Sequence, residues 1–281
     1  MAPEIWATVA AFLFGAAAIA GGLALFRVRG PWEPAAIGAR VAAVVAVTAA
    51  LISAVVAQGE WSPSEPWQIV LSLILAMSGV HLVLAWRLGI GSAGPVVDLV
   101  ALALLLLVHP STPWANPSTA RAWSSLQPAT SLLTCTDRTL PFMVQWGLFF
   151  LGSGSVLVAG SAGLLLALRH VLERWAPGLK LPLRTELYDL LIQSTFLALV
   201  TVGGGLTVAT WWAWQTAGML TGSDPREAWM ALVWLLVAMS LFAWQLERLR
   251  GRWAAAFAGL AAAMVFFGLL VLGELQALLG I

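Results

Sequence analysis

Eight apolar stretches, each close to the length of a membrane-crossing helix, follow one another along this chain. They occupy residues 5–26, 38–57, 67–86, 95–109, 140–168, 188–210, 226–246 and 253–273. A helix that crosses the hydrocarbon core of a bilayer needs about 20 mostly apolar residues, and in lipid its backbone hydrogen bonds must be made internally. The pattern therefore predicts an all-α fold, a polytopic membrane helix bundle of about eight transmembrane helices.

The composition supports this class and excludes others. Of 281 residues, 60% are hydrophobic and 10% carry a charge, which is far from the balance of a water-soluble domain. The net charge of +1, without a basic stripe and interleaved aromatics, excludes nucleic-acid binding. The single cysteine, Cys135, excludes a disulfide within the chain. We expect residues 1–281 to form one integral membrane domain surrounded by lipid.

The placement of Lys and Arg predicts the orientation, because short cytoplasmic connections carry an excess of these residues. Eleven of the 14 fall in alternate connections, at Arg27, Arg29, Arg40, Arg87, Arg169, Arg174, Lys180, Arg184, Arg248, Arg250 and Arg252. The other three are Arg121, Arg138 and Arg226. We therefore expect a multi-pass protein of the cytoplasmic (inner) membrane, with both termini on the outer side. The Ser-, Thr- and Pro-rich connection 110–139 would form a surface loop on that side.

Small residues gather in two of the apolar stretches, at 152–163 and 203–205. Gly and Ser let the backbones of neighbouring membrane helices approach closely. Both stretches therefore predict closely packed helix faces. The three consecutive glycines at 203–205 also permit a bend, or the approach of a flat ligand to the backbone.

The segment Trp211–Trp229 is the one polar stretch that carries a motif, and its second half predicts a helix start. Asp224 offers an N-cap carboxylate, Pro225 suits the first helical position, and Glu227 follows the cap by three residues. We therefore expect a helix to begin at Pro225 and this segment to lie on the outer side.

The first half of the same segment places three tryptophans within four positions, Trp211, Trp212 and Trp214. Indole rings favour the boundary between hydrocarbon and headgroups. We therefore expect this part of the chain to lie at the membrane surface.

Residues 187–272 resemble the tryptophan-rich "WWD" domain of the CcsA/CcmC group of cytochrome c assembly proteins. The run D-P-R-E-A-W at 224–229 matches the end of the family pattern, W-x-W-D-P-K-E-x-W, and an upstream family tryptophan falls on Trp212. The family tryptophans just before the Asp fall here on Ala217, Thr221 and Ser223. The motif is therefore degenerate in its first half.

The resemblance implies haem as a cofactor, handled on the outer membrane face for attachment to a c-type cytochrome. It implies a haem platform made by Trp211, Trp212, Trp214 and Trp229. Arg226 and Glu227, in the first turn of the helix that follows, would either bind a haem propionate or a partner, or face water. The family also brings two outward-facing histidines. Gln145 stands where the first would be, and the second would fall near Gln276 or Ala277.

Three histidines remain as candidate ligands. His109 ends the fourth stretch on the outer side, where it would serve either as a metal ligand to haem iron or as a polar ring at a helix C-terminus. His81 falls well inside the third stretch, and an ionisable residue there is either functional or bonded to a neighbouring helix. His170 belongs to a basic segment that we expect at the surface. Asp98 falls in the first turn after Pro95, where a carboxylate suits the helix dipole.

Two functions remain open after the residues are weighed. One is a haem-handling assembly protein, with an assembly partner and a c-type cytochrome. The other is a non-catalytic structural subunit of a larger membrane electron-transfer complex, held by other integral membrane subunits. The sequence has no nucleophile beside a base, no phosphate-binding glycine loop and no paired carboxylates, so we assign no catalytic residue.

Overall fold

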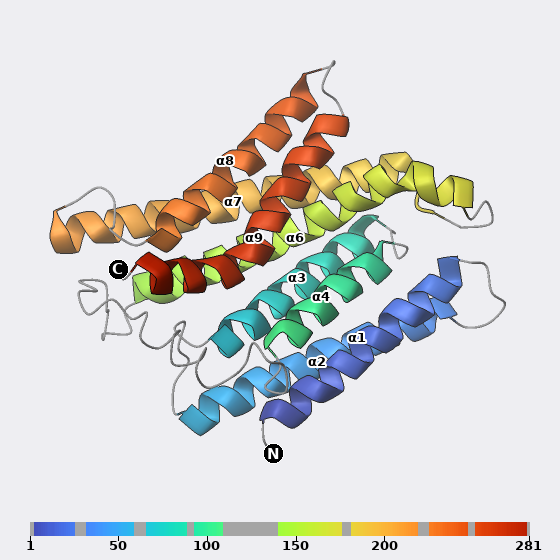
Figure 1. Cartoon of the computed structure of the whole chain (residues 1–281), viewed down its shortest axis with the longest axis horizontal. Coiled ribbons are helices and arrows are strands. Elements are labelled where there is room, and N and C mark those ends of the chain that lie inside the picture. The colour runs from blue at the N-terminus through green and yellow to red at the C-terminus, as the bar shows by residue number, and fades with distance from the viewer. Residues whose placement is uncertain are drawn as a thin grey trace.

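The computed structural model describes residues 3–25, 32–58, 66–88, 93–108, 140–175, 181–218, 225–246 and 251–279. The described residues form eight helices and no strand (Figure 1). The helices are α1 (Pro3–Leu25), α2 (Trp32–Gln58), α3 (Pro66–Leu88), α4 (Gly94–Val108), α6 (Leu140–Trp175), α7 (Arg184–Ala217), α8 (Pro225–Gln245) and α9 (Arg252–Leu279). Each of the eight apolar stretches lies mainly within one of them.

The all-helical membrane class expected from the sequence is confirmed. Six helices are long and apolar enough to cross a membrane: α1, α2, α3, α6, α7 and α8. The apolar parts of α4 and α9 among the described residues, Gly94–Leu107 and Arg252–Gly268, are shorter. The protein is therefore a helical bundle with at least six helices suited to a bilayer.

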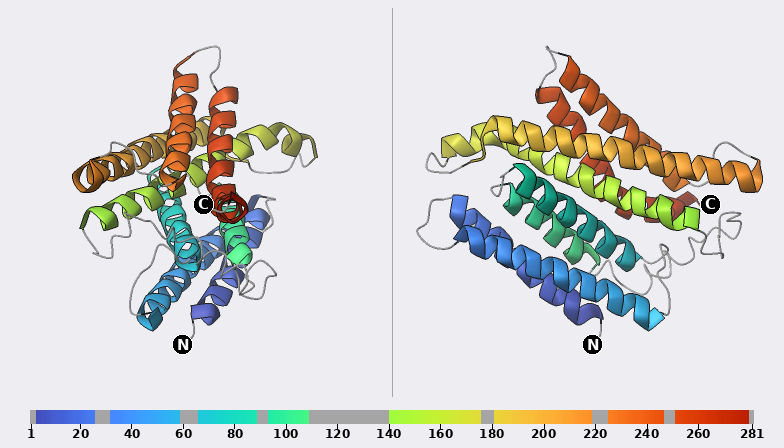
Figure 2. Two further views of the ribbon diagram at one scale, coloured as in Figure 1. Left: turned by 60° about the vertical axis from the view of Figure 1, so that its left-hand side comes forward. Right: turned by 180° about the vertical axis from the view of Figure 1, so that it is seen from behind.

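The helices pack largely as sequential pairs, with α6 in the middle of the bundle. Figure 1 and Figure 2 show α1 beside α2 on one side, α3 and α4 next to them, and α6 lying along α7. The last two helices, α8 and α9, cross this long pair. Helix α6 contacts α3, α4, α7 and α9, so it joins the two halves of the chain.

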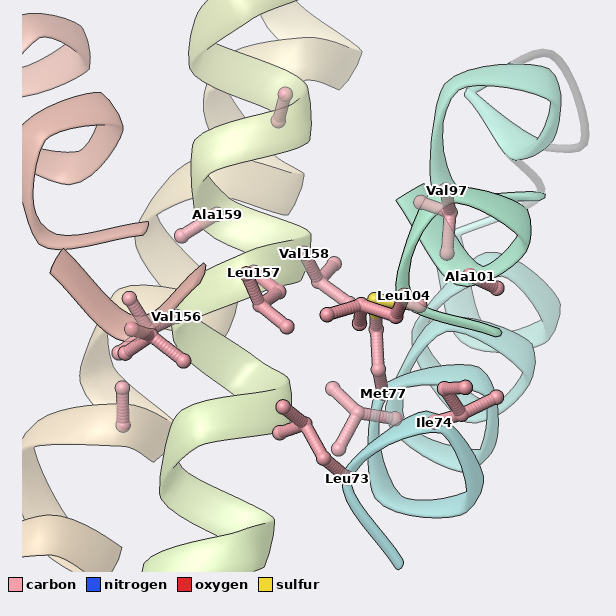
Figure 3. Packing of buried hydrophobic residues seen from close by; sticks show 14 of the residues in the cluster. Leu73, Ile74, Met77, Val97, Ala101, Leu104, Val156, Leu157, Val158 and Ala159 are labelled. Carbon is pink, nitrogen blue, oxygen red and sulfur yellow. The ribbon is translucent and has the colours of Figure 1, made fainter. Parts of the chain in front are cut away.

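The core between α3, α4 and α6 is made of aliphatic side chains (Figure 3). Met77 of α3 and Leu104 of α4 are fully buried and face Val158 on α6. Gly154 of α6 lies against the backbone of Met77, where an added Cβ would stand 2.6 Å from the Met77 nitrogen. The glycine therefore lets α6 and α3 approach closely, as expected from the small residues of 152–163.

Other small residues of α6, on a different face, pack against α9. Gly160 and Gly163 lie against Ala262 and the carbonyl of Ala255. The glycines at 203–205 serve packing too, since α7 continues through them and Phe149 of α6 lies over the last one. Close packing, the first of the two interpretations of these glycines, is what the structure has.

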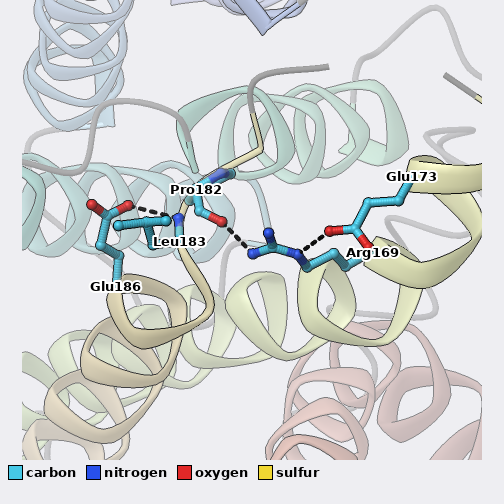
Figure 4. Close-up of polar contacts among 5 residues, drawn as sticks. All are labelled: Arg169, Glu173, Pro182, Leu183 and Glu186. Atoms are coloured by element: carbon cyan, nitrogen blue, oxygen red, sulfur yellow. Dashed lines mark hydrogen bonds and ion pairs between the residues drawn. The ribbon is translucent and has the colours of Figure 1, made fainter. Parts of the chain in front are cut away.

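Polar contacts hold the beginning of α7 against the end of α6 (Figure 4). Arg169 pairs with Glu173 at 2.6 Å on its own helix and also donates to the carbonyl oxygen of Pro182. The Leu183 N–H donates to the Glu186 carboxylate at 2.9 Å, which satisfies one free donor at the start of α7. Of these contacts, the hydrogen bond from Arg169 to Pro182 joins the end of α6 to the residues that lead into α7.

Candidate functional site

The three clustered tryptophans lie in the last turns of α7, which continues seven residues beyond the apolar stretch 188–210. The helix runs on to Ala217 and ends at Gly218, whose φ of 66° is left-handed and whose N–H donates to the Trp214 carbonyl. Tryptophan neither breaks a helix nor supplies a cap, so the first turn signal along this stretch is the glycine. The sequence did contain that signal, at 218.

Two of these indoles are open to the surroundings. Trp211 is 51% exposed and Trp214 is 54% exposed, and their spacing of three residues puts them on neighbouring parts of one helix face. Trp212 is partly buried, with its ring tilted by 50° to that of Trp211 at a centroid distance of 6.2 Å. The end of α7 therefore presents two large aromatic surfaces, backed by a third.

The fourth tryptophan of the motif has a different environment. Trp229 lies in the first part of α8, and its Nε1–H donates to the Met264 carbonyl of α9 at 3.1 Å. Gly268 leaves the space that the indole occupies, since a Cβ there would overlap the ring. The polar edge of Trp229 therefore fastens α8 to α9.

Helix α8 begins at Pro225, as the capping motif predicts. The other residues named for this end of the molecule lie outside the described part of the chain. They are His109, Asp224, the side chains of Pro225 and Arg226, the connection 110–139, and the side chains of Gln276 and Ala277. Glu227 is described and partly buried.

Gln145 is partly buried in the first half of α6, and its backbone carbonyl oxygen faces Gly205 of α7. The position at which the family carries a histidine is therefore next to the helix that bears the tryptophans. An amide is a poor ligand for haem iron.

A second polar cluster lies inside the bundle, and the sequence analysis missed it. The Arg40 guanidinium of α2 donates to both carboxylate oxygens of Asp98 on α4, with both distances 2.7 Å. The two side chains are only 3% and 0% exposed. Two parallel, charge-assisted hydrogen bonds make this a strong and directional contact.

This pair corrects two expectations. The orientation argument counted Arg40 with the first connection, but α2 begins at Trp32 and carries Arg40 into the bundle. Asp98 was assigned to the dipole of its helix, but its carboxylate also binds Arg40. Gly94 makes the contact sterically possible, since a Cβ there would overlap the guanidinium. The sequence did carry a signal for this ion pair, because Arg40 and Asp98 are opposite charges that each fall within an apolar stretch.

His81 lies fully buried on α3, as its position in the sequence predicts. Neither ring nitrogen has a hydrogen-bond partner among the described residues, and the Ser78 hydroxyl one turn away has none either. His81 is therefore enclosed within the bundle and is not among the exposed residues at the end of α7.

The described residues contain no group of three His, Cys, Asp or Glu side chains placed to hold a metal ion. They offer instead an aromatic surface at the end of α7 and an ion pair inside the bundle. The first suits a flat apolar ligand. The second holds helices together.

Comparison with known proteins found no matching family model, no matching curated protein and no matching solved structure. The resemblance to the WWD group therefore rests on the residues quoted from the sequence.

Proposed function

We propose that this chain is a CcsA/CcmC-like membrane protein that handles haem on the outer face of the membrane during cytochrome c assembly. The observation that carries the proposal is the exposed pair Trp211 and Trp214 on one side of the end of α7. Large aromatic side chains left open at a helix end are typical of a membrane interface or of a ligand surface. The adjacent D-P-R-E-A-W motif favours the ligand surface.

Haem binding requires flat apolar contacts and an axial ligand, and the aromatic residues meet the first of these requirements. The ring needs flat apolar contacts, which Trp211, Trp212 and Trp214 would supply while haem is held for attachment to an apocytochrome. An axial ligand must come from His109 or from a partner protein, because the described His81 is buried elsewhere. Arg226 would hold a propionate through charge-assisted hydrogen bonds.

Two observations favour a second candidate, a structural subunit of a membrane electron-transfer complex. Trp229 uses its indole N–H for packing against α9. Gln145 replaces a family histidine on the helix next to α7. Residues that serve the fold have thus been kept while a ligand has been lost, which is the pattern expected of a chain retained for its shape.

An absorption spectrum of the detergent-purified protein, oxidised and reduced, with a haem assay on the same sample, separates the two candidates. Haem handling predicts a Soret band that weakens in His109→Ala and is unchanged in His170→Ala, a substitution in the last turns of α6. A chain without any haem that co-purifies with other membrane subunits would replace the first proposal by the second.

A further inference from the structure

A partly open groove of about 620 Å³ runs along α9 where this helix packs beside α6 and near α4. Its walls are made mainly of residues with small side chains. They include Gly160, Gly163, Ala255, Ala256, Gly259 and Ala263. Small side chains on both walls leave a narrow, smooth channel instead of a pocket for a bulky group.

The two ends of the groove differ in chemistry. Arg252, the first residue of α9, stands at one end together with Tyr188 of α7, and Phe266 and Phe267 close the other. These ends are 14 residues apart along α9, or about 21 Å at the rise of an α-helix. The groove is therefore suited to a long molecule with a polar head and an apolar tail.

The cationic end is available for binding. Arg252 is exposed, and within the described residues no carboxylate pairs with it. The sequence places two more arginines, Arg248 and Arg250, just before it, although these lie outside the described part of the chain. Basic sites between membrane helices on the cytoplasmic side are recognised by anionic headgroups, and an arginine fork matches phosphate oxygens.

The apolar rim of the groove faces the surroundings of the bundle. Leu164 of α6 is 48% exposed and Phe267 of α9 is 53% exposed, and both line the groove. Large apolar side chains exposed on a membrane helix are in contact with lipid. The groove is therefore entered from the bilayer.

We propose that this groove binds an anionic glycerophospholipid, with one acyl chain lying in the groove along the contact of α6 with α9 and the phosphate against Arg252. An acyl chain is slender enough for a groove of about 620 Å³, and the phosphate supplies the anion that Arg252 lacks among the described residues. A second copy of the chain is the competing occupant, which the test below distinguishes. This inference does not depend on haem binding.

The test is native mass spectrometry of the full chain released from micelles that contain phosphatidylglycerol or phosphatidylcholine with the same acyl chains. We expect one phosphatidylglycerol to remain bound and phosphatidylcholine to be retained at least fivefold less. Arg252→Gln should lower phosphatidylglycerol retention to the phosphatidylcholine level. Arg87→Gln, at an exposed arginine that ends α3, is the matched control and should change nothing.

A second variant tests the acyl-chain half of the site. Ala263→Phe places a ring in the groove and should remove the retained lipid, while melting at the wild-type temperature shows that the bundle is intact. Equal retention of both lipids, or an Arg252→Gln variant that binds phosphatidylglycerol like the wild type, would overturn the proposal. So would a protein dimer that Ala263→Phe abolishes, since a second copy would then occupy the groove.

Discussion

Arg40 and Asp98, 58 residues apart in the sequence, face each other in a bidentate ion pair with two donor–acceptor distances of 2.7 Å. The pair joins α2 to α4 across the interior of the bundle, and both side chains are almost fully buried. If one partner is removed, the remaining charge is buried with neither water nor a counter-ion to stabilise it. The contact therefore ties α2 to α4.

Removing one member of the pair should destabilise the protein strongly. We expect Asp98→Asn to lower the free energy of unfolding by about 3–5 kcal/mol, because Arg40 is left charged and buried without its carboxylate. The double variant Arg40→Met/Asp98→Leu should recover most of this loss. Unfolding by SDS in mixed micelles measures both, with the exposed Glu173→Gln as control, expected within about 0.5 kcal/mol of wild type. A double variant as unstable as the single one would contradict this account of the pair.

The close approach of the Arg40 guanidinium to Gly94 leads to a second prediction. A methyl group at Gly94 would overlap Arg40, so Gly94→Ala should cost about 1–3 kcal/mol. Gly79→Ala on α3 has no neighbouring atom within 4 Å of the added carbon and should stabilise the helix by up to about 1 kcal/mol. The same unfolding titration compares the two variants. Equal effects of the same sign would show that Arg40 does not lie against Gly94.

The hydrogen bond between Trp229 and Met264 is expected to contribute modestly to the packing of α8 on α9. Trp229→Phe keeps an aromatic ring but loses the indole N–H, leaving the carbonyl without this donor, and should cost about 1 kcal/mol or slightly more. Trp253→Phe, at an exposed indole on α9, is the comparison and should change stability little. If the two variants were equally stable, the Trp229 contact would be incidental.

The orientation predicted from the basic residues can be tested with the single native cysteine. Cys135 falls in the connection 110–139, which we expect on the outer side, so a membrane-impermeant maleimide should label it in intact cells. Glu173→Cys in a Cys135→Ser background places the thiol at the other end of α6 and should be labelled only after the cells are opened. The reverse pattern would invert the whole topology, including the side assigned to the tryptophans.

Local signals in the sequence were sufficient for much of the fold. The lengths of the apolar stretches predicted where the helices lie, and Pro225 was correctly identified as the start of α8. The end of α7 was placed too early, because three tryptophans were interpreted as a surface segment although nothing before Gly218 stops the helix. Aromatic residues indicate an environment and say little about where a helix ends.

Local signals in the sequence could not predict the contacts between distant residues. Nothing within either apolar stretch shows that Arg40 meets Asp98, because the pairing depends on how α2 and α4 pack and on the space left at Gly94. The role of Trp229 was likewise hidden, since the motif gave it to a haem platform while the structure has its N–H on Met264. Trp211 and Trp214 are exposed, and their place at the membrane surface stays a prediction.

The haem content of purified variants tests the central proposal most directly. Trp211→Ala/Trp214→Ala removes the two exposed indoles of α7, and Trp175→Ala/Trp253→Ala removes two exposed indoles at the opposite end of the bundle. The account predicts haem in the wild type and in the second variant, and at least fivefold less haem in the first, with all three proteins melting at similar temperatures. Equal haem content in both variants, or a wild-type protein without haem, would contradict it.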